Sequence, residues 1–307
     1  CTEVGFFYIK NHFVDQNIIS DTFIEAEGFF DASIDVKMEV NIENSETLRG
    51  YTALLAAEHD DSGKDFHEGF DLALDLDSSD EDVKSGVFGY GPNQWPSGRD
   101  SFKSTLLNYH SSMVDFGKKI FESFALALEL PINHFEGAIT KPMAHMRVLH
   151  YPPQDPKSGT EQMGIGAHSD YECFTILCTS DVPALQVLNT DGVWIEAPPI
   201  EGAFMVNVGD LMARWTNDYF QSTVHRAINL SGRRRYSIPF FYGPNSKEIA
   251  DFARLWLAAS SASWASETTK CPRASTSGKA AWCSKGTTSP TKAASQRYFQ
   301  SLSLIHI

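Results

Sequence analysis

The sequence has few cysteines, few positive charges and no long apolar run. Its five cysteines are odd in number and scattered along 307 residues, without the close pairs of a structural zinc site. We therefore expect no disulfide framework and predict that the protein works in the reducing cytoplasm. No segment approaches the roughly 18 consecutive apolar residues of a membrane helix, and no charged-then-apolar leader opens the chain, so we expect neither membrane insertion nor secretion.

Positive charge is outnumbered, since 25 Lys and Arg stand against 39 Asp and Glu and give a net charge of −14. Nucleic-acid binders need cationic side chains to neutralise phosphates, so the composition argues against that class. With 42% hydrophobic residues, the chain can bury one large core or two small ones. We expect a protein that binds a small molecule and acts as a monomer.

The first hundred residues predict a mixed, partly helical N-terminal region. The aromatic run GFFYIKNH is typical of a buried strand, and Asp15 is placed to cap a helix whose apolar residues extend to Phe29 and Phe30. Residues 55–100 are acidic and punctuated by Gly and Pro, which favours loops. Because the chain opens on Cys1 only a few residues before the strand, we predict that region 1–100 lacks its start.

The next segment predicts one long helix with a structural role. From Asp100 onward, apolar residues recur every three or four positions until just before Pro131. This spacing places them on one face of the helix, which would pack against the rest of the protein. We assign residues 101–140 to this supporting helix.

Residues 141–246 predict a β domain. Short runs rich in β-branched and aromatic residues alternate with turn residues, namely HMRVLHY, CFTILC, LQVLN, VWIEA, AFMVNVGD, HRAINL and RYSIPFFY. Many short strands of this kind indicate an antiparallel sandwich or jelly roll. The predicted fold class is therefore mainly β with flanking helices (α+β), and we expect the chemistry in this domain.

The segment 247–307 is atypical. From residue 254 onward it holds seven Lys or Arg, one acidic residue and three of the six tryptophans, with no sustained period. A flexible, disordered tail is one interpretation, but disordered segments seldom carry so much Trp. We prefer the hypothesis that this segment is out of frame, which sequencing the transcript through codons 245–260 would test.

His168 and Asp170 stand two residues apart in the run GIGAHSDYECFTIL. Alternate side chains of a strand share a face, so the two could grip one divalent metal ion, although loop capping also explains such a pair. His225, 55 residues after Asp170, could complete a set of two histidines and one carboxylate with open coordination positions. Other histidines are more typical of surface or core positions, although His150 lies close enough to the predicted site to matter.

Arg235 and Ser237 repeat the two-residue spacing shortly after His225. The arginine fork matches a carboxylate and the hydroxyl adds a hydrogen bond, so the pair predicts a site for an anionic group. The alternative is a basic turn without a ligand, which is our interpretation of the neighbouring Arg233 and Arg234.

Together these motifs resemble those of a known family. His168-x-Asp170, His225 and Arg235-x-Ser237, set in the runs GAHSDYECFTIL, GVWIEAPPIEGAFMVNVGD and STVHRAINLSGRRRYSIPFFYGPN, are similar to the Fe(II)- and 2-oxoglutarate-dependent dioxygenases of the isopenicillin N synthase-like group. The upstream runs GFFYIKNH, RGYTAL, GPNQWP and LHYPP also resemble that group, so the resemblance covers about residues 3–246. It implies a double-stranded β-helix, or jelly roll, as the core of the β domain.

The resemblance also implies roles for individual residues. It implies an Fe(II) site and a 2-oxoglutarate site, formed respectively by His168, Asp170 and His225 and by Arg235, Ser237 and Tyr151. The implied reaction consumes O2 and 2-oxoglutarate, releases succinate and CO2, and hydroxylates or otherwise oxidises a small organic metabolite. Asn207 and Asp210 match a turn of the family, which we interpret as structural.

The substrate pocket is the least determined part of the site. The reaction needs a positioned substrate and excluded water, so apolar walls from Phe174, Ile176 and Phe240 are candidates, although each alone is more typical of sandwich core. Two other functions stay open: an iron-dependent oxidase that does not use 2-oxoglutarate, and a non-catalytic sandwich that binds a small molecule. The segment after residue 246 does not match the helices that close the pocket in this family, so the sequence predicts no particular substrate.

Overall fold

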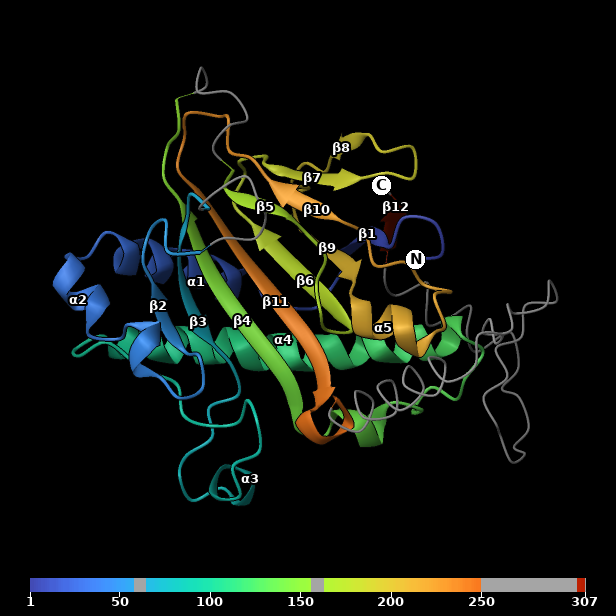
Figure 1. Cartoon of the computed structure of the whole chain (residues 1–307), viewed down its shortest axis with the longest axis horizontal. Coiled ribbons are helices and arrows are strands. Elements are labelled where there is room, and N and C mark those ends of the chain that lie inside the picture. The colour runs from blue at the N-terminus through green and yellow to red at the C-terminus, as the bar shows by residue number, and fades with distance from the viewer. Residues whose placement is uncertain (58–64, 156–162, 250–302, 307) are drawn as a thin grey trace, which may run out of the picture.

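A computed structural model describes residues 1–57, 65–155, 163–249 and 303–306 (Figure 1). Two antiparallel sheets form its centre, and helices flank them (Figure 1). In chain order the elements are β1 (Phe6–Lys10), α1 (Gln16–Phe30), α2 (Ile34–Met38), η1 (Ile42–Asn44), β2 (Gly50–Thr52), β3 (Glu68–Leu72), α3 (Glu81–Lys84), α4 (Asp100–Ala127), η2 (Glu136–Ile139), β4 (Pro142–Tyr151), β5 (Ile165–His168), β6 (Phe174–Thr179), β7 (Leu185–Leu188), β8 (Trp194–Glu196), β9 (Ala203–Val208), α5 (Asp210–Trp215), β10 (His225–Ala227), β11 (Arg235–Asn245) and β12 (Ser303–His306).

The two sheets pack face to face as a sandwich. The larger has the strand order β12-β1-β9-β6-β11-β4-β3-β2, and the smaller has the order β5-β10-β7-β8. One apolar cluster joins them, because Phe6 and Met205 of the larger sheet pack with Leu185 and Val187 of the smaller one. The sandwich predicted from the short alternating runs is therefore confirmed, and each of the seven runs contains a strand.

Helix α4 covers the other face of the larger sheet, and Figure 1 shows it crossing behind the strands. Phe121 and Phe124 of α4 contact the Phe174 ring, which stacks on Tyr242 with centroids 5.3 Å apart. The predicted amphipathic helix is thus confirmed from Asp100 onward. It ends at Ala127, however, so the rest of segment 101–140 consists of loop and the short η2 helix.

The N-terminal strand and helix are also confirmed. The aromatic run forms the buried strand β1, and the Asp15 side chain caps α1 by accepting a hydrogen bond from Asn17 N at 2.9 Å. Strand β1 pairs with β9 on one side and with β12 on the other.

The segment 55–100, which we expected to be rich in loops, also contains a strand that the sequence did not predict, β3, and this strand is buried along its whole length. Its two acidic side chains are tolerated there because each has cationic or histidine partners from other elements. Glu68 binds Lys37 and His150, and Asp71 binds side chains of β4.

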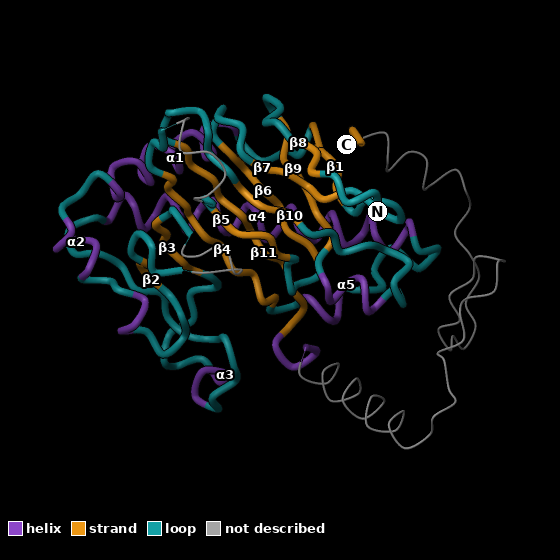
Figure 2. Tube along the Cα trace, turned by 45° about the horizontal axis from the view of Figure 1, so that its top comes forward, coloured by secondary structure: helices purple, strands orange, loops and turns teal. Residues whose placement is uncertain are grey.

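The predicted atypical segment 247–307 lies almost entirely outside the described residues, as do residues 58–64 and 156–162. None of the helices in the described part of the chain combines the length and apolar character needed to cross a lipid bilayer. In both views α5 lies at the end of β9, next to the loop that precedes β6 (Figure 2). The candidate site lies where α5, the end of β9 and the loop before β6 meet.

Candidate active site

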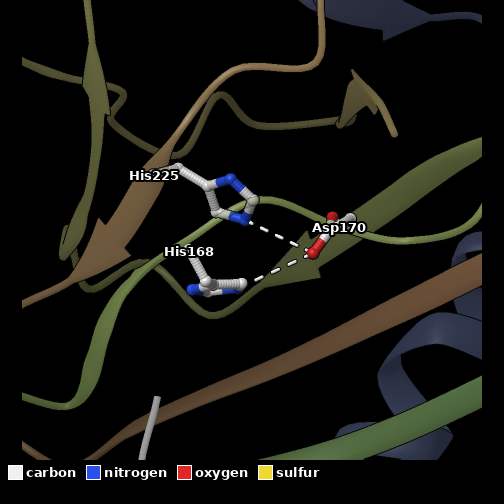
Figure 3. Close-up of side chains that lie close together, drawn as sticks. All are labelled: His168, Asp170 and His225. Atoms are coloured by element: carbon white, nitrogen blue, oxygen red, sulfur yellow. Dashed lines mark ion pairs between the residues drawn. The ribbon is translucent and has the colours of Figure 1, made fainter. Parts of the chain in front are cut away.

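The two predicted histidine ligands come from neighbouring strands of the smaller sheet. His168 ends β5, His225 begins β10, and the two residues are directly paired in the sheet. Each Nδ1 donates to a backbone carbonyl two residues earlier, at 2.8 Å to Gly166 O and 3.1 Å to Thr223 O. Since Nδ1 carries the proton, each Nε2 has a lone pair that can bind a metal ion, and both Nε2 atoms lie near the same oxygen of Asp170 (Figure 3).

Asp170 completes this group from the loop after β5. The period-two argument for His168 and Asp170 is therefore corrected, because the strand ends at His168 and the loop turns the carboxylate back. Asp170 Oδ1 lies 3.6 Å from the Nε2 atom of each histidine (Figure 3). Oδ2 accepts hydrogen bonds from Thr175 Oγ1 and, at 2.7 Å, from Asn207 Nδ2. The carboxylate is thus fixed with one oxygen facing the histidines.

The backbone of the Asp170 loop is held by the start of α5. Asp210 N donates to Asp170 O at 2.8 Å, and Gly209 N donates to Cys173 O at 2.9 Å. A side chain at Gly209 would place its Cβ 2.1 Å from Glu172 O, so only glycine permits this approach. The turn that we interpreted as structural therefore positions a predicted metal ligand.

The three residues fit a divalent metal ion. Their ligand atoms all lie within 4.8 Å of one another. Among the described residues, no other group of three or more His, Cys, Asp or Glu side chains is arranged so that it could hold a metal ion. Two imidazole nitrogens and one carboxylate oxygen on one side of an ion leave its other positions open, which is the donor set of non-haem Fe(II) sites. Their hydrogen bonds to backbone and side chains prevent the ligands from turning away.

The three predicted co-substrate residues lie together on β4 and β11. Arg235 pairs with Tyr151 in the sheet, and its guanidinium lies 4.6 Å from the centre of the Tyr151 ring. Ser237 Oγ donates to the Tyr151 hydroxyl at 3.3 Å. Arg235 is 2% exposed, and its Nη1 has no hydrogen-bond partner among the described residues. A buried donor without a partner is well placed to bind an anionic oxygen of a ligand.

A cavity of about 690 Å³ between the sheets contains both groups. This volume is in the range of sites for small organic molecules. Apolar side chains such as Leu149, Leu177 and Pro239 line it alongside the two groups. It therefore offers a small molecule a partly dry space next to the three metal-binding candidates.

The candidate walls Phe174, Ile176 and Phe240 are corrected, because none of them lines the cavity. All three are fully buried on the opposite face of the larger sheet, in the core beneath α4. Successive residues of a strand face opposite sides, so Pro239 and Phe241 face the cavity and Phe240 does not. The sequence could have predicted this, because Arg235 and Ser237 face the site and the other odd-numbered residues of the same strand must face the same side.

His150 also faces away from the cavity. Its Nδ1 is 2.8 Å from Glu68 Oε1 and its ring stacks on Tyr236. It therefore belongs to the core, and its nearness to the site in sequence is of no consequence.

The sequence did not single out Arg49, Asp71 and Arg147, and it assigned His145 to the surface or core, but all four line the cavity. Arg147 and His145 precede Tyr151 by four and six residues, so the parity of β4 could have placed both on the Tyr151 face. No comparable signal existed for Arg49, or for Asp71, which lies in the segment 55–100 that composition assigned to loops.

Burial and charge also shift the ionisation of one cavity residue next to the metal-binding candidates. Burial raises the pKa of Glu172 to about 7, and the neighbouring carboxylate of Asp170 adds to the rise. The cavity wall near Asp170 and Glu172 is therefore less negative than two ionised carboxylates would make it.

Comparison with known proteins agrees with this geometry. Residues 142–244 match the 2OG-Fe(II) oxygenase superfamily, and residues 1–98 match the family described as non-haem dioxygenase in morphine synthesis N-terminal. The chain is 34% identical to the 2-oxoglutarate-Fe(II) type oxidoreductase hxnY of Emericella nidulans, over 81% of this chain and 73% of that protein. It is 36% identical to the homoarginine-6-hydroxylase 2-ODD-C23 of Glycine max, over 80% and 75% of the respective chains.

Solved structures show the same fold. A full-length Neurospora crassa protein in complex with alpha-KG superimposes with a TM-score of 0.70 at 28% identity, covering 79% of this chain and 76% of that one. JOX2 in complex with 2OG, Fe and JA gives a TM-score of 0.65 at 27% identity, over 80% and 69% of the respective chains. The predicted jelly-roll core with flanking helices is confirmed, and the chain belongs to the 2OG-Fe(II) oxygenase superfamily.

Proposed function

We propose that this protein couples the oxidative decarboxylation of 2-oxoglutarate to the hydroxylation or other oxidation of a small organic molecule, using Fe(II) and O2. One observation carries the proposal. The convergent ligand atoms of His168, Asp170 and His225 share one cavity with Arg235, whose Nη1 has no hydrogen-bond partner among the described residues. When bound, the iron activates O2 and 2-oxoglutarate supplies two electrons as it becomes succinate and CO2.

The residues of the chain provide binding, orientation and a restricted environment. His168, Asp170 and His225 would hold the ion on one side and leave its cavity side open to ligands. Arg235 offers an anionic group the planar fork of its guanidinium, with Ser237 and Tyr151 as further hydrogen-bonding groups. The apolar side chains around them limit water, which protects a reactive site from unproductive chemistry.

The first experiment measures succinate formation from 2-oxoglutarate with and without Fe(II) and O2. We expect succinate only when all three are present, and loss of turnover after chelation. His225→Ala removes one ligand and should abolish turnover, whereas His134→Ala removes an exposed histidine outside the cavity and should not. Normal turnover by His225→Ala would refute the metal assignment.

Arg235 separates this proposal from an oxidase that does not use 2-oxoglutarate. Arg235→Met removes the charged fork but keeps a long side chain, so the 2-oxoglutarate concentration required for half-maximal rate should rise by roughly tenfold or more. An iron-dependent oxidation that proceeds at full rate without 2-oxoglutarate would favour the oxidase. A protein that binds neither iron nor 2-oxoglutarate would favour the non-catalytic sandwich.

Related proteins suggest the first substrates to test. One relative is named a homoarginine-6-hydroxylase, and one solved neighbour is in complex with thymine. We propose a substrate of comparable size for this cavity, and L-homoarginine and thymine are suitable initial probes. Either should increase 2-oxoglutarate consumption if this chain shares the corresponding specificity.

We further propose that the protein acts as a monomer in the cytoplasm. The buried cysteines Cys173 and Cys178 form no disulfide, which supports a reducing compartment. Light scattering after size-exclusion chromatography should give a mass near 34.1 kDa, and cell fractionation should place the protein with cytoplasmic enzymes.

A further inference from the structure

A cluster of charged side chains lies in the same cavity, away from the predicted iron and 2-oxoglutarate residues. We call Arg49, Asp71, His145 and Arg147 the Arg–Asp cluster. Asp71 on β3 and Arg147 on β4 are direct partners in the sheet. Arg49 and Asp71 are each 3% exposed, whereas His145 and Arg147 are partly exposed, and all four border the cavity.

The hydrogen bonds within the Arg–Asp cluster leave specific atoms unused. His145 Nε2 lies 2.7 Å and Arg147 Nε 2.9 Å from the same oxygen, Asp71 Oδ1. Asp71 Oδ2 has no partner in the described part of the chain. Arg49 donates from Nη2 to Gly89 O at 2.7 Å, but its buried Nε is also without a partner there. One acceptor, Asp71 Oδ2, and two donors, Arg49 Nε and Arg147 Nε, therefore lack a hydrogen-bond partner among the described residues, although Arg147 Nε forms an ion pair with Asp71 Oδ1.

A second buried cluster in the same sheet shows how a purely structural group is satisfied. Glu68, three residues before Asp71 on β3, faces the core instead of the cavity. Its Oε1 contacts His150 at 2.8 Å, and its Oε2 accepts from Lys37 at 2.8 Å and from Tyr51 at 2.6 Å. Both of its oxygens are used, whereas only one oxygen of Asp71 is. The unused oxygen of Asp71 borders the cavity and can therefore bind a ligand there.

The charges of the Arg–Asp cluster also favour a ligand with a negative group. The pKa of Asp71 is raised by burial, but the nearby Arg147 and His145 outweigh that effect and keep it below its usual value. Burial lowers the pKa of Arg49 to about 10, so its guanidinium still carries its charge near neutral pH. The cluster thus holds two guanidinium groups and one carboxylate, which leaves an excess of positive charge.

Strand register places the Arg–Asp cluster within reach of the metal-binding residues. Thr175, which donates a hydrogen bond to Asp170, pairs with Phe241 of the neighbouring strand β11. Phe241 in turn pairs with His145 of β4. Two strand spacings correspond to about 10 Å. Along β4, Arg147 lies four residues from Tyr151, or about 13 Å, so the cluster and the 2-oxoglutarate residues occupy different ends of the cavity.

We propose that the Arg–Asp cluster binds the polar head of the primary substrate, and that this substrate is a small carboxylic acid with an amino or hydroxyl group next to its carboxylate. The carboxylate would pair with Arg49 and Arg147, and Asp71 Oδ2 would accept the hydrogen bond of the adjacent donor. The inference rests on the proposed function, because it names the substrate class of the same site. The remainder of the substrate would extend toward His168, Asp170 and His225.

The substrate class is tested with matched probes. The twenty common L-amino acids, the corresponding 2-hydroxy acids, the corresponding acids without either group, the corresponding amines and thymine are each added to the iron-loaded protein, and 2-oxoglutarate consumption is measured. We expect at least one amino or hydroxy acid to stimulate consumption about tenfold more than its amine counterpart. The amino and hydroxy series then show which donor is preferred. Equal stimulation by amines or thymine, or none by any acid while 2-oxoglutarate is consumed, would overturn the proposal.

Variants test the residues themselves. Arg147→Met should weaken binding of the best acid by at least about tenfold, measured by calorimetry, and Arg147→Lys should recover part of it. Asp71→Asn should weaken binding of the amino or hydroxy acid but not of the acid that lacks this group, so that the preference disappears. Arg214→Met, an exposed arginine of α5 outside the cavity, is the control. Thermal melts establish that each variant is folded.

Failure of the proposed substrate class can be distinguished from failure of the proposed function. If the wild type consumed no 2-oxoglutarate with iron and O2, the proposed function would fail, yet calorimetry would still measure binding of the acids. If Arg147→Met raised the 2-oxoglutarate requirement and left acid binding unchanged, the Arg–Asp cluster would be part of the co-substrate site and this inference would be wrong.

Discussion

At the scale of single residues, the metal-binding candidates depend on the groups that orient them. Asp170 Oδ2 is occupied by Asn207 and Thr175, which leaves Oδ1 as the oxygen nearest to both histidines. The same division of roles occurs in each imidazole, where Nδ1 is bonded to backbone and Nε2 is left for an ion. The site is therefore preorganised before any metal arrives.

Asn207→Ala should loosen Asp170 and lower the affinity for Fe(II) by roughly 10- to 100-fold, because partners of ligand residues contribute that much in metal sites. Anaerobic titration calorimetry measures the affinity directly. Asn108→Ala, at an exposed position of α4, is the matched control. Unchanged affinity in Asn207→Ala would mean that Thr175 and the backbone alone hold the carboxylate.

At the scale of elements, strand β3 is kept in the sheet by paired charges. Burial alone would raise the pKa of Glu68, but hydrogen bonds from His150, Lys37 and Tyr51 lower it to about 2. The folded pKa is thus below the unfolded value. The stabilisation is present above about pH 4.5 and is lost as the pH falls toward 2.

Glu68→Gln should therefore lower the free energy of unfolding by about 3 kcal/mol at pH 7, and the difference from wild type should shrink as the pH is reduced from 4.5 to 2. Urea unfolding at several pH values measures both quantities. The exposed Glu46→Gln serves as control and should follow the wild type throughout. A difference that stays constant with pH would show that lost packing, and not lost charge, explains the effect.

Helix α4 lies unusually close to β11 at one position. A Cβ on Gly117 would lie 2.1 Å from a ring carbon of Tyr242, which is itself fully buried. Gly117→Ala should destabilise the protein by about 1–3 kcal/mol, although alanine is normally the better helix residue.

Gly28→Ala in α1 is the matched control for this change, because its nearest neighbour would be Arg99 Nη1 at 3.9 Å. We expect it to be neutral or stabilising in the same thermal melts. Stabilisation by both substitutions would show that α4 can move away from the sheet.

The elements that the sequence predicted well are those whose signal is local. Alternation located the strands of the β domain, and Asp15 located the start of α1. Strand β3 was missed because Glu68 and Asp71 look like surface residues until their partners, which lie far away in sequence, are known.

The candidate site shows the same limit. His168, Asp170, His225, Arg235, Ser237 and Tyr151 were found from their spacing and from resemblance, and the structure brings them into one cavity. The identities of the walls depend on which face of each strand points inward, and on contacts between strands. Phe174 and Phe240 were therefore placed on the wrong side of the larger sheet.

At the scale of the whole molecule, the candidate site joins the two sheets. His168 and His225 belong to the smaller sheet, whereas Asp170 is held by β6 and β9 of the larger one. An ion bound by all three would link the sheets through bonds that the metal-free protein lacks. Ligand binding should therefore be visible as global stability.

Fe(II) and 2-oxoglutarate, added anaerobically at about 100 times their dissociation constants, should each stabilise the fold by about 2.7 kcal/mol. For a chain of 307 residues that corresponds to a rise in Tm of roughly 4 °C for one ligand. Scanning calorimetry measures the shift, and His225→Ala should show none with Fe(II). A wild-type protein that binds Fe(II) without any rise in Tm would contradict the link between the sheets.

One face of strand β4 lines the cavity, and its other face packs in the core. Its odd-numbered residues from Met143 to Tyr151 line the cavity, while Ala144, Met146 and Val148 pack in the core. During evolution, point substitutions at the odd positions can change what the cavity binds without disturbing the core. A one-residue insertion or deletion would exchange the two sets at once. Descendants of this protein should therefore diverge at Met143, His145, Arg147 and Leu149, while Tyr151 and the length of β4 stay fixed.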